Sequence, residues 1–327
     1  MAGSGYGRRH AGRDDQRRRV AARALRARMV RRIVAGGGLT DPAWRAAFAE
    51  VPRDLFVLDD EGAEGAEAAG EWDDAPYASD AGTQAGTHPG TQAADQRRWL
   101  RRLSGAYADR PIATRVVGGE LVSSSSQPSL MALMCEALEV RDGDRALEIG
   151  AGTGYNAALL AHRLGPGTVT TMDLEPEITA AARAHLDAYG SEAARSVEVV
   201  TGDGALGHPP RAPYDRIMAT CELPSVPAAW LEQCVPGGLV LVPLASGLVT
   251  LTVAGPDRAQ GRFLRTPAYF VPLRGAYAGA GRRGWAQELF GDGWREDRTR
   301  YGLTIDGGRQ WLWRDDPAGP DTWPLVS

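Results

Sequence analysis

The chain has no lysine, only three cysteines and no apolar run long enough to cross a membrane. All 37 of its basic residues are therefore arginine. Cys135, Cys221 and Cys234 are odd in number and lack metal-ligand spacing, which argues against a disulfide framework or a metal site and predicts reduced, buried thiols. Because a bilayer span needs about 20 apolar residues, we expect no membrane association.

The N-terminus is polar and arginine-rich. It lacks the apolar stretch of a secretory signal, which favours a cytoplasmic protein. A net charge of −4 is too small to indicate a nucleic-acid partner. With 327 residues, 43% of them hydrophobic, the chain is long enough for one large α/β domain with extensions, or for two smaller domains.

The first part of the chain divides into three segments by composition. Residues 1–15 form a polar, glycine-containing tail that we expect to be disordered. Residues 16–58 form a helical segment, with an amphipathic helix that ends at three glycines and a second helix capped by Thr40. Residues 59–96 are first acidic and then rich in Gly, Thr and Gln, which predicts a flexible low-complexity insertion.

Residues 97–245 alternate between short apolar runs and helical patterns, which predicts a doubly wound parallel sheet. The expected strands cover 145–149, 169–172, 197–200, 216–220 and 239–242, and the expected helices cover 127–138, 155–164, 176–189 and about 227–234. Residues 246–327 form a C-terminal extension, in which strands at 249–253 and 262–264 are expected to pair across a Gly-Pro-Asp turn.

A glycine-rich turn follows the first strand of this pattern, in the segment Glu148-Ile-Gly-Ala-Gly-Thr-Gly-Tyr155. Such a turn before a helix offers free N–H groups and close backbone access to a ligand. Its spacing differs from the G-x-G-x-x-G of a pyrophosphate site, which disfavours a nicotinamide oxidoreductase. The carboxylate of Glu148 suits a partly cationic ligand, and the turn therefore predicts a site for S-adenosylmethionine.

Acidic residues also follow the next two strands. Asp173 ends the second strand, where a carboxylate can hold ribose hydroxyls, although that position would suit a nicotinamide dinucleotide equally well. Asp203 follows the third strand, where it can accept a hydrogen bond from an adenine amino group. Acids at successive strand ends predict a nucleoside ligand at one edge of the sheet.

Several motifs occur in an order that resembles the protein-L-isoaspartate O-methyltransferase family. They are Val51-Pro-Arg-Asp-Leu-Phe-Val57, Tyr107-Ala-Asp-Arg-Pro111, Ser126-Gln-Pro128, the glycine-rich turn, Gly202-Asp-Gly204, Ala212-Pro-Tyr-Asp-Arg-Ile217 and Leu231-Glu-Gln-Cys-Val-Pro-Gly-Gly238. The resemblance covers about residues 16–57 and 105–245. It implies a Rossmann-like class I methyltransferase fold, here with N-terminal helices and a C-terminal extension.

The resemblance also implies roles for individual residues. Ser126 stands at the family's catalytic serine, although Ser124-Ser-Ser126 replaces the usual Thr-Ile-Ser. The implied cofactor-binding residues are Ser123, Ser124, Ser125, Glu148, Gly150, Gly152, Gly154, Tyr155, Asp173, Leu174, Asp203, Gly204 and Thr220. A carboxylate acceptor is ionised at neutral pH and needs no general base. This is consistent with the lack of an evident His–Asp or Cys–His pair.

The acceptor is less defined than the cofactor. Candidate substrate-binding residues are Ser125, His208, Cys221, Trp311 and Trp313. The two tryptophans are either binding anchors or core residues on one face of a strand.

The extension and the serine run resemble a subgroup that methylates an aspartate of an already modified ribosomal precursor peptide, in graspetide or lanthipeptide maturation. The ester there leads to aspartimide and then isoaspartate. The alternative is repair of isoaspartyl residues in damaged proteins. A non-enzymatic peptide-binding module is disfavoured by the intact Glu148, Asp203 and Ser126.

Overall fold

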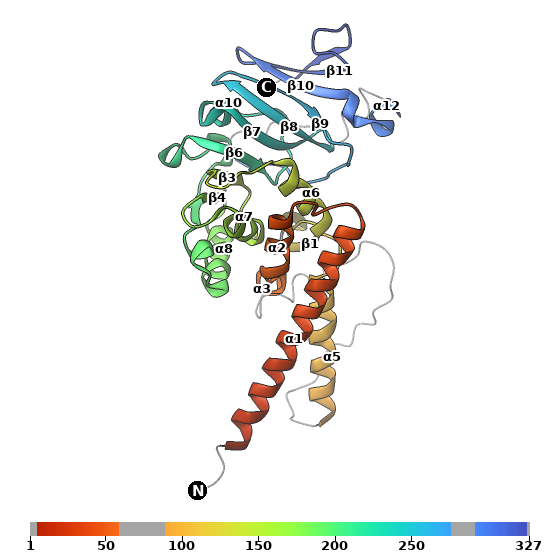
Figure 1. The fold of residues 1–327 in the computed structure, drawn as a ribbon, viewed down its shortest axis with the longest axis vertical. Helices are drawn as coiled ribbons and strands as arrows, with labels where there is room; N and C mark the ends of the chain where they lie inside the picture. Colours follow the sequence, from red (N-terminus) through yellow and green to blue (C-terminus); the bar gives the residue numbers. More distant parts are fainter. Residues whose placement is uncertain (1–4, 59–88, 276–291, 326–327) are drawn as a thin grey trace.

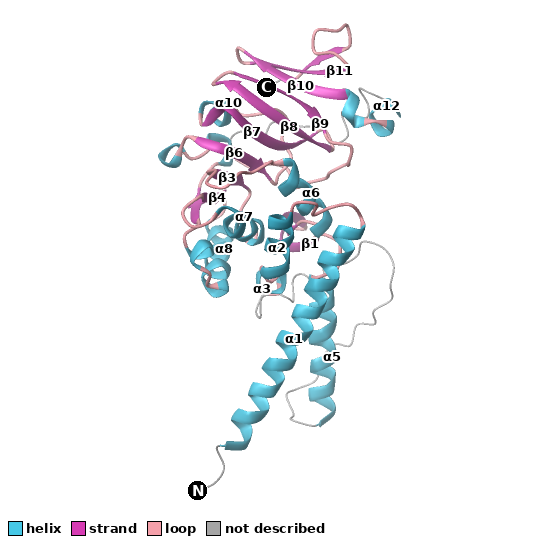
Figure 2. Ribbon diagram, viewed as in Figure 1, coloured by secondary structure: helices cyan, strands magenta, loops and turns pink. Residues whose placement is uncertain are grey.

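A computed structural model describes residues 5–58, 89–275 and 292–325 of the chain. Its centre is a ten-stranded sheet with helices packed against it, and two long helices extend away from the body at one end (Figures 1 and 2). No helix of the described residues is both long and apolar enough to cross a membrane.

Five parallel strands form one half of the sheet, in the order β5-β4-β3-β6-β7. Their bounds are Ala146–Ile149 (β3), Val169–Asp173 (β4), Glu198–Thr201 (β5), Tyr214–Ala219 (β6) and Cys234–Leu244 (β7). Helices α7 (Tyr155–Leu164), α8 (Pro176–Tyr189), α9 (Glu192–Arg195) and α10 (Ala228–Glu232) lie between them in the chain, with the short 3-10 turns η1 (Gly204–Leu206) and η2 (Pro209–Arg211). The predicted doubly wound sheet is therefore confirmed.

The C-terminal extension continues the same sheet with antiparallel strands. These are β8 (Gly247–Gly255), β9 (Arg258–Phe263), β10 (Tyr301–Asp306), β11 (Arg309–Arg314) and β12 (Thr322–Pro324). Helix α12 (Asp292–Glu296) and the 3-10 turn η3 (Arg298–Arg300) come directly before β10 in the chain. The predicted β8–β9 hairpin is present. The predicted division after residue 245 falls in the turn between β7 and β8, and one hydrophobic core joins Leu147 of β3 to Leu312 of β11. The sheet is therefore mixed, and the extension is not a separate unit.

The N-terminal helices begin earlier than the composition predicts. Helix α1 spans Gly5–Ala35, so most of the expected disordered tail is helical and continues into residues 16–35, whose many Arg and Ala residues have strong helix propensity. Helix α5 spans Pro89–Ala106 and takes up the end of the predicted insertion, of which residues 59–88 lie outside the described residues. The two helices meet where the Arg18 guanidinium lies 5.1 Å from the centre of the Trp99 ring.

Two further helices join α1 to the body. These are α2 (Pro42–Glu50) and α3 (Arg53–Val57). Asp41, not Thr40, caps α2, because its carboxylate accepts a hydrogen bond from Ala43 N at 2.7 Å. Thr40 instead donates its hydroxyl to Glu136, 2.8 Å away.

A hairpin that the sequence did not predict lies between the N-terminal helices and the parallel core. It consists of β1 (Ile112–Val117) and β2 (Glu120–Ser125), which pair antiparallel and form a sheet of their own. Helix α6 (Pro128–Ala137) follows two residues later. The hairpin and α6 together place the serine run 123–126 beside the glycine-rich turn, because a Cβ added to Gly152 would lie within 4 Å of atoms of Ser123 and Ser124.

Candidate active site

The glycine-rich turn between β3 and α7 has a backbone that other residues rarely adopt. Gly150 has a φ of +99°, and a Cβ there would lie 2.4 Å from Thr220 Oγ1. Thr220 in turn donates its hydroxyl to the Gly150 carbonyl at 2.8 Å. The end of β6 therefore packs directly on the turn, and this close approach requires glycine.

Two cavities flank this turn. The larger holds about 530 Å³ of space that is partly open to solvent, and it lies between β2, the ends of β3, β4 and β6, and the segment 271–274. The smaller holds about 390 Å³, also partly open, and lies between the serine run, α6 and the start of α7. Both cavities are lined by Ser124, Gly150, Gly152 and Thr220.

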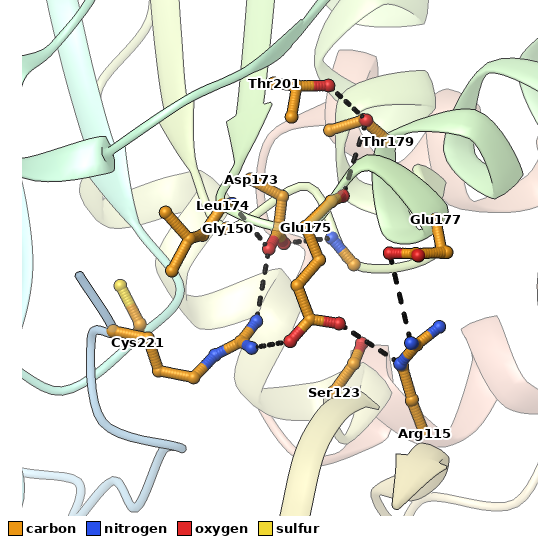
Figure 3. A network of polar contacts seen from close by, with 12 residues as sticks. Arg115, Ser123, Gly150, Asp173, Leu174, Glu175, Glu177, Thr179, Thr201 and Cys221 are labelled. Carbon is orange, nitrogen blue, oxygen red and sulfur yellow. Dashed lines mark hydrogen bonds and ion pairs between the residues drawn. The ribbon is translucent and has the colours of Figure 1, made fainter. Parts of the chain in front are cut away.

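Asp173 lies in the larger cavity, at the end of β4. Its carboxylate accepts hydrogen bonds from Gly152 N at 3.2 Å and from Leu174 N at 2.9 Å. Burial raises its pKa, while the Gly152 bond and the positive charge of Arg274 act in the opposite direction. Figure 3 shows Asp173 next to Glu175, which also forms an ion pair with Arg115 of β1, at 3.1 Å.

Glu148 lies fully buried under the turn. One carboxylate oxygen accepts from Asn156 Nδ2 at 2.7 Å and the other from Thr171 Oγ1 at 2.6 Å. Burial raises its pKa to about 7, against the opposing effect of these two hydrogen bonds. Each oxygen is thus already paired with the protein, so Glu148 ties β3 to α7 and β4 even though it borders the smaller cavity.

The serine run forms the wall between the two cavities. Ser123 and Ser124 line the larger cavity, and Ser124, Ser125 and Ser126 line the smaller one. Ser123 is buried and its hydroxyl accepts from Thr114 Oγ1 at 3.0 Å. The four serines therefore lie together in one wall between the two cavities.

Two other predicted cofactor positions behave differently. Gly204 lines the larger cavity, whereas Asp203 does not. The Oδ1 atom of Asp203 accepts a hydrogen bond from Ala205 N at 3.0 Å. A Cβ added to Gly275 would lie only 2.7 Å from the Oδ2 atom of Asp203. The segment 271–275 thus packs against Asp203. Tyr155 lines the smaller cavity, with its ring centre 5.6 Å from that of Phe56.

The residues proposed for substrate binding separate into two groups. Ser125 and Cys221 line the cavities, and burial raises the pKa of the Cys221 thiol. His208 lines neither cavity. Its Nε2 atom lies 3.2 Å from Glu198 Oε1, and its backbone N–H donates to Gln233. Because these contacts hold His208 between β5 and α10, it does not reach the site.

Trp311 and Trp313 also lie away from the cavities. They stand on β11, six strand spacings from β3, which corresponds to roughly 29 Å. Trp313 is only 1% exposed and donates its ring N–H to Thr304 Oγ1 at 3.0 Å. The interpretation of Trp313 as a binding anchor is wrong, because its ring fills the space opposite Gly302. Trp311 is half-buried and donates to the Pro317 carbonyl.

Several lining residues were missed by sequence reasoning. Val271, Pro272, Leu273 and Arg274 close one side of the larger cavity, and Met131, Met134 and Asn156 line the smaller one. The segment 271–274 is anchored by Glu222, whose N–H donates to the Val271 carbonyl and whose own carbonyl accepts from Leu273 N, both at 2.8 Å. The run Phe270-Val-Pro-Leu-Arg274 was visible in the sequence, but nothing local linked it to Asp173.

The parallel strand order and the glycine turn at the carboxyl ends of β3 and β4 define a Rossmann-like methyltransferase fold with N-terminal helices. Two solved structures share this fold. A protein-L-isoaspartate O-methyltransferase has a TM-score of 0.60 at 23% identity, covering 92% of this chain and 85% of its own. A Plasmodium falciparum protein assigned the same activity, solved with S-adenosyl-L-homocysteine, has a TM-score of 0.52 at 14% identity, covering 77% and 98%.

Sequence comparison is more specific than the fold. Residues 92–275 match the model of the protein-L-isoaspartate(D-aspartate) O-methyltransferase family. A protein-L-isoaspartate O-methyltransferase of Methanoregula boonei is 36% identical over 254 residues, 77% of this chain and 94% of that protein. One from Archaeoglobus fulgidus is 38% identical over 173 residues, 53% of this chain and 76% of that protein. The chain belongs to the protein-L-isoaspartate O-methyltransferase family and is an S-adenosylmethionine-dependent enzyme.

Proposed function

We propose that this enzyme methylates the free carboxylate of isoaspartyl residues in proteins or peptides. The observation that carries the proposal is the serine run 123–126, which forms a shared wall between a cavity that ends at Asp173 and a second cavity beside Ser126. A methyl donor and a carboxylate acceptor need two adjoining spaces of this kind, because the transfer is mainly a matter of alignment. The family membership supports the repair-type substrate over the precursor peptide.

The larger cavity fits the cofactor. The Asp173 carboxylate stands where ribose hydroxyls would be held, and a Cβ on Gly152 would meet no protein atom closer than 3.7 Å, so the turn leaves room for a ligand. We assign Gly150, Gly152, Asp173, Leu174, Gly204 and Thr220 to cofactor binding, with Ser123 and Ser124 on the opposite wall. When bound there, S-adenosylmethionine supplies an electrophilic methyl group.

The smaller cavity fits the acceptor. Ser126 is half-buried at its wall, and its hydroxyl would orient an acceptor oxygen by a hydrogen bond. The acceptor carboxylate is already ionised at neutral pH, so the chain needs to supply orientation and no proton transfer. Burial raises the pKa of the Cys221 thiol, which disfavours it as a nucleophile.

The proposed substrate is tested with two peptides of the same sequence, one with an isoaspartyl linkage and one with a normal aspartyl linkage. The enzyme is incubated with S-adenosylmethionine and either an isoaspartyl peptide or the same peptide with normal Asp, and mass spectrometry follows a gain of about 14 Da, the mass of a methylene group. We expect methylation of the isoaspartyl peptide alone.

Ser126→Ala should lower kcat about 10- to 100-fold, while S-adenosyl-L-homocysteine binds as before. Wild-type kcat in this variant would remove Ser126 from the mechanism.

A modified ribosomal precursor peptide that carries normal Asp tests the second substrate class. An aspartate of a modified ribosomal precursor would be methylated and then lose methanol, about 32 Da, on closing to an aspartimide. The observation that favours the precursor peptide as a second candidate substrate is the serine run, which departs from the family's usual Thr-Ile-Ser. The extension does not favour it, because Trp313 is buried and β8–β12 complete the sheet. Methylation of Asp in a modified peptide, with none of the isoaspartyl peptide, would reverse the proposal.

A further inference from the structure

Arg53, the first residue of α3, lies directly behind the serine run. It is fully buried, and its guanidinium joins two segments that are far apart in the sequence. Nη1 donates to the Ala106 carbonyl at 2.9 Å, and Nη2 donates to the Ser126 carbonyl at 3.0 Å and to Ser125 Oγ at 3.2 Å. Arg53 therefore fixes the loop that carries Ser125 and Ser126.

The charge of Arg53 has no acidic partner within 4 Å in the described part of the chain, although the more distant Asp109 carboxylate and the Tyr155 ring, whose centre lies 5.9 Å from the guanidinium carbon, partly stabilise it. All of its hydrogen-bond acceptors are carbonyl or hydroxyl oxygens, and its Nε–H has no partner there. Arg216, another buried arginine, has Asp144 Oδ2 at 3.2 Å. A buried cation without a directly paired acid is costly, so its position behind the serine run is notable.

The hydrogen bonds also fix the orientation of two peptide groups. The carbonyls of Ser125 and Ser126 both point toward Arg53, the first at 3.4 Å. In a trans peptide the N–H points opposite to the carbonyl, so the N–H groups of Ser126 and Gln127 point away from Arg53. Arg53 lines neither of the two cavities, and it therefore acts on the serine wall from behind.

We propose that Arg53 is a positioning residue for the acceptor carboxylate, an inference that rests on the proposed function. Its hydrogen bonds hold Ser126 in place, and its positive charge, which no acid pairs directly, favours an anionic acceptor in the adjoining cavity. The two contributions are separable. Loss of the geometry lowers kcat, because Ser126 is misplaced, whereas loss of the charge raises KM for the anionic peptide.

Two substitutions separate these effects in the full-length enzyme, assayed with the isoaspartyl peptide. Arg53→Lys keeps the charge but loses the planar fork, and we expect kcat to fall about 3- to 10-fold with KM within about twofold. Arg53→Gln loses both, and we expect KM to rise about tenfold in addition. Binding of S-adenosyl-L-homocysteine, measured by calorimetry, should stay within about twofold in both variants, which also shows that they are folded.

Arg216→Gln is the matched control. It removes a buried arginine that is paired with an acid, and we expect lower thermal stability with unchanged KM. If the wild-type enzyme does not methylate the isoaspartyl peptide, the proposed function fails. If it does and Arg53→Gln keeps the wild-type KM, the role of Arg53 fails. Should Arg53→Gln not fold, wild-type kcat in Arg53→Lys would overturn the proposal, and a lowered kcat with unchanged KM would support it.

Discussion

The guanidinium of Arg274 lies 3.4 Å from the carboxylate of Asp173, a residue 101 positions earlier in the chain. Arg274 also pairs with Glu175, which in turn pairs with Arg115 of the β1–β2 hairpin. A chain of alternating charges thus connects the hairpin, the end of β4 and the segment 271–274 across one side of the larger cavity (Figure 3).

This ion pair predicts a pH effect on cofactor binding. Arg274 lowers the pKa of Asp173, which burial raises, so Arg274→Gln should raise that pKa further. Asp173 would then be protonated at a higher pH and would lose its charge for the ribose hydroxyls. We expect the affinity for S-adenosyl-L-homocysteine to begin falling at a higher pH than in the wild type as the pH is lowered from 8. Calorimetric titrations at several pH values measure this.

Arg258→Gln controls for the loss of one positive charge, since Arg258 is exposed on β9, away from the cavity. Glu148 also titrates near neutral pH, but it is common to all three proteins. Superimposable pH profiles for wild type and Arg274→Gln would contradict the coupling between Arg274 and Asp173.

The glycine-rich turn predicts opposite outcomes for two neighbouring substitutions. Gly150→Ala places a Cβ 2.4 Å from Thr220 Oγ1 at a φ of +99°, and we expect it to destabilise the fold by about 2–4 kcal/mol. Gly152→Ala has no protein atom within 3.7 Å and a φ of +51°, and should cost only about 1–2 kcal/mol.

The Cβ at position 152 would instead enter the space proposed for the cofactor. We expect Gly152→Ala to bind S-adenosyl-L-homocysteine at least about tenfold more weakly, a loss of about 1.4 kcal/mol, while remaining folded. Urea denaturation and calorimetry compare the two variants. Full cofactor affinity in Gly152→Ala would show that the turn does not border the ligand, and equal stability losses would contradict the close packing of Gly150 on Thr220.

The raised pKa of Glu148, about 7, predicts a pH-dependent stability. The native state binds a proton at Glu148 that the unfolded state has released at its ordinary pKa of about 4.3. This contribution to the free energy of unfolding is therefore fully present below the unfolded pKa and is lost as the pH rises through about 7. Glu148→Gln should flatten this decline, changing the difference in stability between pH 5 and pH 8 by on the order of 1–3 kcal/mol. If the stability of the wild type and of Glu148→Gln changed with pH in parallel, the predicted contribution of Glu148 would be refuted.

Replacing Trp313 and replacing Trp311 by alanine should lower the free energy of unfolding by different amounts. Trp313→Ala empties a buried position, and we expect a loss of about 3–5 kcal/mol in the free energy of unfolding. Trp311→Ala removes a half-buried side chain and should cost less. Because both lie roughly 29 Å from β3 along the sheet, KM for the isoaspartyl peptide should be unchanged in either folded variant. A rise in KM for Trp311→Ala would return β11 to the substrate site.

The sequence by itself determined the parallel half of the sheet and its glycine turn. Short apolar runs, the helical periodicity of α7 and α8, and the spacing of Gly150, Gly152 and Gly154 are local signals, and local signals survive without knowledge of the fold. Asp173 was found in the same way, because the end of a parallel strand is a position that the strand itself defines. The family resemblance extended this to the serine run.

Only the tertiary structure decided which distant segments meet at the site. Arg53 reaches Ser126 across 73 residues, and Arg274 reaches Asp173 across 101. No periodicity encodes such contacts, because they depend on how the hairpin β1–β2 and the segment 271–275 pack on the sheet. The same reason explains Trp313, whose strand pattern is equally compatible with an exposed and a buried ring. Pairing of β10 with β9 and β11 is what buries it.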